Sequence, residues 1–180
     1  MLRLFIGLEL PGTVLDRLEQ LCSGLKEARW VEPHNMHLTL FFIGEIDEGQ
    51  AEDLHHGLDK IRFDPFDLYL AELNCFAHKH QPSSIWAGVK GDVVALHHLQ
   101  NKVRGAVEIA GIEAEKRKYK PHVTIARLKK TPSEQALSYM EAHNVLKTEA
   151  FTVSRFTLFR SHLTRHGAEY EVLERYGLRK

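Results

Sequence analysis

The sequence has few cysteines and no excess of either charge, and each of these two features excludes a class of protein. Only two of its 180 residues are cysteine, Cys22 and Cys75, which is too few for a disulfide framework and does not match a metal-ligand spacing. Lys plus Arg and Asp plus Glu both number 24. This balance argues against a protein that coats long nucleic acid through bulk charge, although it allows a local basic patch.

Long hydrophobic runs and low-complexity segments are also missing. No apolar stretch approaches the roughly 20 residues that span a bilayer, and the first residues lack the apolar core and cleavage site of a signal peptide. The chain is 43% hydrophobic and 27% charged, which is ordinary for a globular protein. We therefore expect one cytoplasmic domain over residues 1–180, with no membrane partner, no obligate protein partner and a monomer as the default state.

Two distant stretches share a His-x-Thr pattern inside apolar, β-branched runs that are typical of strands. The first contains His37 and Thr39, and the second contains His122 and Thr124. Side chains alternate between the two faces of a strand, so each His shares a face with its Thr while apolar residues occupy the other face. Two such strands facing each other would place two imidazoles and two hydroxyls around a small anionic group.

The remaining pattern predicts strands and amphipathic helices in two similar sets, each with one His-x-Thr strand. Further strands are expected at residues 2–10, 66–73, 84–89, 151–158 and 169–173, and helices at 14–28, 48–61, 93–110 and 133–143. We therefore predict an α+β fold with two pseudo-symmetric, internally duplicated lobes. Antiparallel sheets are expected to line a central cleft, with the helices on their outer faces.

Several segments together resemble the two-histidine (2H) phosphoesterase superfamily. The segments are WVEP followed by HLTLFFIGE, then KPHVTIAR, with RLFIGLELP, SSIWAGV and SHLTRHGAEYEVL in the rest of the chain. Within that superfamily the sequence is similar to the bacterial and archaeal RNA 2′,3′-cyclic phosphodiesterases, once called 2′-5′ RNA ligases. One departure is visible, because Ser83 and Ser84 occupy a stretch where the family often has an Arg.

The residues and the resemblance point to the same chemistry. Two histidines with pKa values near ~6.5 can divide acid and base work at neutral pH, which predicts a bell-shaped rate profile there. The hydroxyls of Thr39 and Thr124 can donate to phosphate oxygens. The residues alone leave open which imidazole is the acid. The resemblance implies that His37 donates a proton to the leaving 3′ oxygen and His122 accepts one from water, giving a 2′-phosphomonoester without a metal or other cofactor.

Three further residues are candidates for substrate binding. Arg127 resembles the family's phosphate-gripping Arg, although strict alternation aims it away from His122, so the strand must bend near it. Phe41 has the same strand parity as His37 and is predicted to stack on a base. Lys120 ends a basic segment, residues 116–120, that would guide RNA into the cleft. The expected substrates are RNA 3′ ends or small nucleotides that carry a 2′,3′-cyclic phosphate.

The sequence also allows other interpretations of its histidines and of its function. A third His-x-Thr occurs at His162, but a turn follows it directly, which predicts a solvated loop. Histidine pairs at 55–56, 78–80 and 97–98 suggest a metal site, although they lack the i, i+4 spacing of known helical zinc motifs. A non-catalytic module that binds RNA ends, and a protein whose main activity is reversible 2′-5′ ligation, are the functional alternatives.

Overall fold

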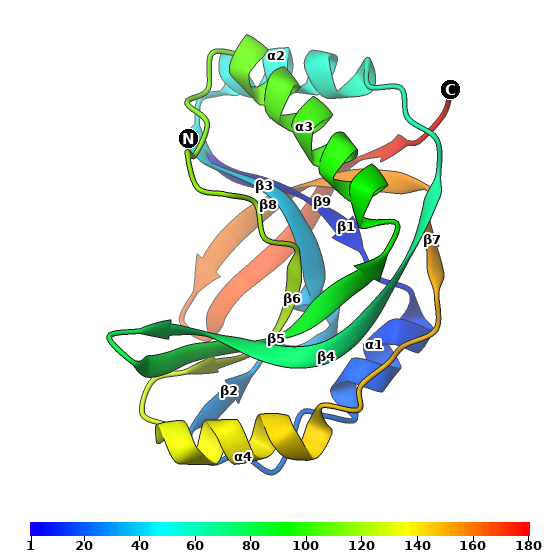
Figure 1. Ribbon diagram of the computed structural model, residues 1–180. Helices are drawn as coiled ribbons and strands as arrows, with labels where there is room; N and C mark the ends of the chain where they lie inside the picture. Colours follow the sequence, from blue (N-terminus) through cyan, green and yellow to red (C-terminus); the bar gives the residue numbers. More distant parts are fainter.

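The computed structural model describes residues 1–180 and contains two antiparallel sheets (Figure 1). The four-stranded sheet has the order β3 (His37–Ile46), β1 (Leu2–Glu9), β8 (Arg155–Thr164) and β9 (Gly167–Gly177). The five-stranded sheet has the order β2 (Ala28–Trp30), β6 (His122–Leu128), β5 (Gln81–Gly91), β4 (Phe66–His78) and β7 (Phe151–Val153). Each sheet therefore contributes one of the two His-x-Thr strands, β3 and β6.

Four α-helices lie on the outside of the sheets. They are α1 (Gly12–Glu19), α2 (Glu48–Asp59), α3 (Val93–Ile109) and α4 (Ser133–His143), and a short 3-10 helix, η1 (Pro33–Asn35), precedes β3. The helices α2 and α3 lie at one end of the molecule, and α1 and α4 at the other (Figure 1). None of them combines the length and the apolarity needed to cross a membrane. The predicted α+β architecture, with antiparallel sheets and outer helices, is confirmed.

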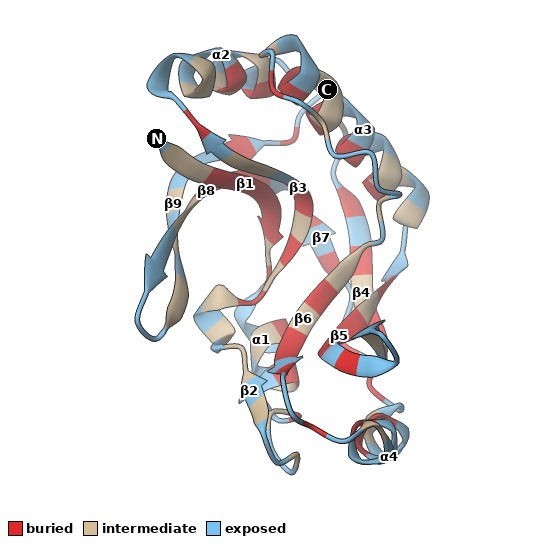
Figure 2. Cartoon of the chain, turned by 90° about the vertical axis from the view of Figure 1, so that its left-hand side faces the viewer, coloured by how far each residue is buried: buried red, intermediate tan, exposed pale blue.

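The apolar backs of the two motif strands are buried in one continuous core. Leu38, Leu40, Val123 and Ile125 are all essentially inaccessible and belong to the same hydrophobic cluster. In Figure 2 the buried residues follow β1, β3 and β6, whereas the far end of the β8–β9 hairpin is exposed. A slip of one residue in β3 or β6 would turn these apolar side chains into the cleft, so burial fixes which face carries the histidines.

Strand β3 contains a β-bulge directly after its motif. Its pairing with β1 moves from Gly7 opposite Thr39 to Ile6 opposite Phe41, so Leu40 has no partner of its own. A bulge reverses the alternation of the residues that follow it. The prediction that Phe41 shares the face of His37 is therefore wrong: Phe41 is 6% exposed in the core, and Phe42, 48% exposed, takes the cleft face.

Strand β6 contains a bulge at the corresponding position. Its pairing with β5 moves from Thr124 opposite Trp86 to Ala126 opposite Ile85, which leaves Ile125 as the extra residue. The bulge is the bend near Arg127 that is expected for this strand. It places Arg127 on the same face as Thr124. From their histidines onward the two motif strands thus share one order of burial: half-buried, buried, half-buried, buried, buried, exposed.

Three predicted segments differ from the structure. Helix α1 ends at Glu19, far short of residue 28, because Gly24 turns the chain with a φ of 81° and residues 28–30 pair with β6. The strand predicted at 151–158 breaks at Ser154, where the chain leaves the five-stranded sheet as β7 and enters the four-stranded sheet as β8. His162 lies in β8 and not in a loop, although its side chain is exposed beside Glu171.

Candidate active site

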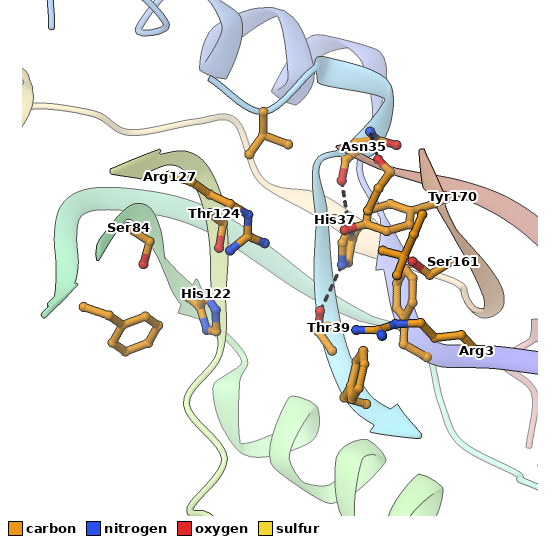
Figure 3. A pocket seen from close by; sticks show the side chains of 16 residues that line it. Arg3, Asn35, His37, Thr39, Ser84, His122, Thr124, Arg127, Ser161 and Tyr170 are labelled. Carbon is orange, nitrogen blue, oxygen red and sulfur yellow. Dashed lines mark hydrogen bonds between the residues drawn. The ribbon is translucent and has the colours of Figure 1, made fainter. Parts of the chain in front are cut away.

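A pocket of about 420 Å³ lies between the two sheets and brings both motifs together. Both motif histidines, both motif threonines and Arg127 line it, as Figure 3 shows. The two motif strands lie more than 80 positions apart in sequence and belong to different sheets. The predicted cluster of two imidazoles and two hydroxyls around one cavity is therefore present in the structure.

The ring of His37 is held by hydrogen bonds at both nitrogens. Its Nδ1 lies 2.8 Å from the carbonyl oxygen of Asn35, and its Nε2 lies 2.9 Å from Oγ1 of Thr39. Because a carbonyl can only accept, Nδ1 carries a proton and donates it to Asn35. In the neutral ring Nε2 then keeps its lone pair and accepts from the Thr39 hydroxyl, so the nitrogen available for proton transfer is Nε2.

Aromatic rings enclose His37 and change its acidity. The ring centroids of Phe5, Tyr170 and Phe159 lie 4.7, 5.1 and 5.9 Å from that of His37. Burial lowers the pKa of His37 to about 4, and the positive charge of Arg127 adds to this, whereas the bond to Asn35 opposes it. At neutral pH the imidazole of His37 is therefore uncharged in the empty pocket.

His122 repeats the arrangement on the opposite sheet. Its Nδ1 lies 2.7 Å from the carbonyl oxygen of Lys120, again two residues upstream, so this nitrogen is also the donor and Nε2 is the nitrogen left for proton transfer. The rings of Phe76 and Trp86 flank it at 4.9 and 5.6 Å. Burial lowers the pKa of His122 below its ordinary value, and Lys120 and Arg127 lower it further against the opposing backbone bond.

Two contacts hold the motif strands in place around the pocket. The hydroxyl of Tyr119, three residues before His122, donates to the backbone oxygen of Thr39 at 2.9 Å and so ties one motif segment to the other. Gly7 lies behind the motif of β3, where an added Cβ would come within 2.9 Å of the carbonyl oxygen of Leu38 and 3.4 Å of the His37 ring. Only glycine lets β1 approach the motif this closely.

The pocket suits an anion. Its lining includes two guanidinium groups, those of Arg3 and Arg127, and no carboxylate. The hydroxyls of Ser84, Ser161 and Tyr170 add hydrogen-bond donors. Unpaired positive charge and converging donors in a recessed site are the features that bind phosphate groups in proteins.

The β8–β9 hairpin forms one side of the pocket. The guanidinium of Arg29 in β2 donates to the carbonyl oxygen of His166 at the hairpin tip. The side-chain nitrogen of Asn35 donates to the carbonyl oxygen of Ala168 at 3.0 Å. Because β2 belongs to the five-stranded sheet and the hairpin to the four-stranded one, the Arg29 bond joins the two sheets, whereas the Asn35 bond ties the hairpin to η1 ahead of β3.

The other two predicted binding residues lie next to this pocket and not in it. Phe41 and Lys120 both line a neighbouring hollow, and the Lys120 ammonium lies 5.1 and 5.6 Å from the ring centres of Trp86 and Phe76. Sequence reasoning missed Arg3, Phe42 and Tyr170, which do line the pocket. Strict strand alternation does not predict Phe42 on the pocket face, because it does not include the bulge. Arg3 and Tyr170 reach the pocket through strand pairings, which no short sequence motif predicts.

The histidine pairs considered as metal ligands do not form a cluster. No three His, Cys, Asp or Glu side chains in the chain come together in an arrangement that could hold a metal ion. Instead, His55 Nδ1 lies 2.8 Å from the Tyr176 hydroxyl, and the ring of His97 packs edge-on against Tyr119. These contacts give two of the candidate histidines packing roles.

Comparisons with known proteins show which family the chain belongs to. A family model described as the 2′-5′ RNA ligase superfamily matches residues 10–165. The RNA 2′,3′-cyclic phosphodiesterase of Aeropyrum pernix is 34% identical over 144 residues, covering 79% of this chain and 82% of that protein. The protein of the same name from Bacillus subtilis is 30% identical, covering 97% of this chain and 95% of its own.

Solved structures show the same fold. The TT0787 protein of Thermus thermophilus has 29% identity and a TM-score of 0.79, covering 98% of each chain. E. coli LigT in its apo form has 23% identity and a TM-score of 0.82, covering 99% of this chain and 98% of its own, and supports the fold alone. The resemblance inferred from the motifs is thereby confirmed. The chain belongs to the 2′-5′ RNA ligase superfamily, whose model spans both of its His-x-Thr strands.

Proposed function

We propose that this protein hydrolyses RNA or nucleotide 2′,3′-cyclic phosphates to 2′-phosphomonoesters, with His37 and His122 as a metal-independent acid–base pair. One observation carries the proposal above the others. Both imidazoles anchor Nδ1 on the carbonyl two residues upstream, which leaves two Nε2 atoms at one pocket that has positive charge and no carboxylate. The activity named for the relatives from Aeropyrum pernix and Bacillus subtilis supports the same substrate class.

In the proposed reaction each histidine handles one proton. Nε2 of His122 takes a proton from water as the water oxygen bonds to phosphorus. The bond between phosphorus and O3′ breaks on the opposite side, and His37 gives O3′ its proton through Nε2. The phosphate stays on O2′, and Thr39, Thr124 and Arg127 donate to the non-bridging oxygens as negative charge builds up there.

The low pKa of His37 has to be reconciled with its role as the acid. In the empty pocket this imidazole is neutral at pH 7, because its pKa is about 4. An anionic phosphate at its Nε2 favours the charged ring and raises that pKa. The substrate anion and the catalytic proton therefore bind together, and the acid is formed when the pocket is filled.

Phe42 takes over the base-stacking role that the sequence predicted for Phe41. It is the most exposed aromatic ring that lines the pocket, and the Arg3 guanidinium lies 5.4 Å from its ring centre. Stacking of an unpaired base on an exposed ring contributes about 1–3 kcal/mol. This contact works for any base, so we expect it to strengthen binding without selecting among the four.

The decisive experiment is to incubate the protein with adenosine 2′,3′-cyclic phosphate and follow the products by phosphorus NMR. We expect adenosine 2′-phosphate as the product, at a rate that EDTA does not reduce. Binding without turnover would support a non-catalytic module, and loss of activity with EDTA would contradict the metal-independent mechanism. Joining of RNA ends in place of hydrolysis would favour ligation.

Replacing either catalytic histidine tests the division of labour. We expect His37→Ala and His122→Ala each to lower kcat by about 10²–10⁴-fold, the usual contribution of a positioned acid or base. His162→Ala is the matched control, since His162 belongs to the third His-x-Thr but its Nε2 pairs with Glu171 outside the pocket. Near wild-type turnover in either catalytic variant would refute the mechanism.

A further inference from the structure

A second hollow of about 410 Å³ adjoins the candidate active site. Thr39, Phe42, Phe76 and His122 line both cavities, so a ligand bound between the histidines can continue into the second one without leaving the protein surface. Its far wall comes from α3, through Gln100 and Arg104, and from the basic segment before β6. A hollow of this size is within the range that binds small organic ligands.

Two sides of the active-site pocket differ. The bonds from Arg29 to His166 and from Asn35 to Ala168 hold the β8–β9 hairpin in place along one side of the pocket. The second hollow opens from another side, past Thr39 and His122. In a 2′,3′-cyclic phosphate, phosphorus is bonded to both O2′ and O3′. The attacking water, phosphorus and O3′ lie on one line during the reaction, so the ribose lies to one side of that line. The second hollow, which shares four lining residues with the pocket, gives the nucleoside a continuous direction in which to extend.

The charges in this hollow match an RNA backbone. Arg104 and Arg117 are already paired with Glu108 and Glu115, at 3.2 and 3.0 Å. Lys118 and Lys120 line the same hollow, and neither forms an ion pair. A terminal nucleoside with its cyclic phosphate between the histidines carries its next phosphate on O5′. Unpaired lysines next to the pocket are placed to attract that group.

We propose that this second hollow binds the nucleotide that precedes the terminal one, so that the enzyme prefers RNA ends to cyclic mononucleotides. The inference rests on the proposed hydrolysis of cyclic phosphates and adds the length of substrate that the site recognises. Lys118 attracts the phosphate that joins the last two nucleotides, and the remaining volume of the hollow accommodates the penultimate nucleoside.

Three substrates test this proposal: adenosine 2′,3′-cyclic phosphate, its 5′-phosphorylated form, and the dinucleotide ApA ending in a 2′,3′-cyclic phosphate. We expect kcat/KM of the dinucleotide to exceed that of the unphosphorylated mononucleotide by about tenfold, as expected for a hydrogen bond to a charged group plus added contacts. Equal values for all three would overturn the proposal. A 5′-phosphorylated mononucleotide as good as the dinucleotide would also overturn it, because the hollow would then recognise a phosphate and not an RNA chain.

Two lysine variants locate the effect. We expect Lys118→Ala to lower the dinucleotide-to-mononucleotide ratio of kcat/KM by about three- to fivefold, the range for an exposed charge pair. Lys116→Ala removes the same charge from the same segment but lies outside both cavities, and it should leave the ratio unchanged. An unchanged ratio in Lys118→Ala, or an equal fall in both variants, would contradict the proposal. Failure of wild-type protein to hydrolyse any of the substrates would instead refute the proposed function.

Discussion

At the scale of single residues, the environment of each histidine matters as much as its identity. Both motif histidines have an ordinary imidazole, yet aromatic neighbours and nearby cations lower both pKa values. The motif in the sequence predicts which side chains meet. It does not predict their protonation, because Phe5, Tyr170 and Phe76 reach the rings from other strands.

The lowered pKa values predict a shifted pH dependence. Both histidines lose their protons at lower pH than a free imidazole, so we expect the optimum of kcat/KM to lie on the acid side of ~6.5. Bound phosphate raises the pKa of His37, so the kcat profile should lie at higher pH than the kcat/KM profile. Steady-state rates from pH 4 to 9 check both points, and two coincident profiles centred above pH 7 would contradict them.

The motif threonines make a second test at this scale. Removing a hydroxyl that donates to a charged phosphate costs about 1.5–3 kcal/mol, so we expect Thr39→Val and Thr124→Val each to lower kcat/KM by about 10- to 100-fold. Serine keeps the hydroxyl, and Thr39→Ser and Thr124→Ser should retain most of the activity. Equal losses in the valine and serine variants would contradict this role, because only the valine variants lack the hydroxyl.

At the scale of secondary-structure elements, the sequence predicts regular segments well and irregular ones poorly. The helices at 48–61, 93–110 and 133–143 are observed to within about two residues at each end, because apolar periodicity marks them. In the structure the side chains of Asp47 and Asp92 cap the first two of these helices. The bulges after both motifs and the break at Ser154 arise from pairing with distant strands. Such long-range constraints leave little trace in the local pattern.

The bulge in β3 separates the roles of two adjacent phenylalanines. Phe41→Ala removes a core side chain and should lower the free energy of unfolding by about 3–5 kcal/mol. Phe42→Ala removes an exposed ring at the pocket, so it should raise KM for nucleotide substrates with little loss of stability. Denaturant unfolding and steady-state kinetics on both variants check this, and a reversal of the two phenotypes would place the bulge elsewhere.

At the scale of the whole molecule, the two sheets repeat one plan. Each contains a His-x-Thr strand with a bulge after the motif, and each anchors its histidine on the carbonyl two residues upstream. We infer from these shared details that the chain arose by duplication of one unit. The residues after the bulges, Phe42 and Arg127, differ between the halves, and the proposed function assigns the first to a base and the second to phosphate.

The buried histidine also ties catalysis to stability. Unfolding returns the pKa of His37 from about 4 to its ordinary value, so the unfolded state binds the extra proton as the pH falls below ~6.5. We expect the free energy of unfolding to drop by about 2 kcal/mol between pH 7 and pH 5 from this group alone. His37→Asn should lose less stability over that range, and equal losses in both proteins would contradict this assignment.

The bonds that hold the β8–β9 hairpin, from Arg29 in β2 and from Asn35 in η1, have a consequence for which molecules the proposed reaction can reach. We infer that a hairpin held in this way along the pocket admits an RNA chain only with its last nucleotide leading. Circular RNA and the interior of a long strand have no terminal nucleotide that could enter first. Under the proposed function we therefore expect linear RNA with a terminal cyclic phosphate to be hydrolysed and circular RNA to be left intact.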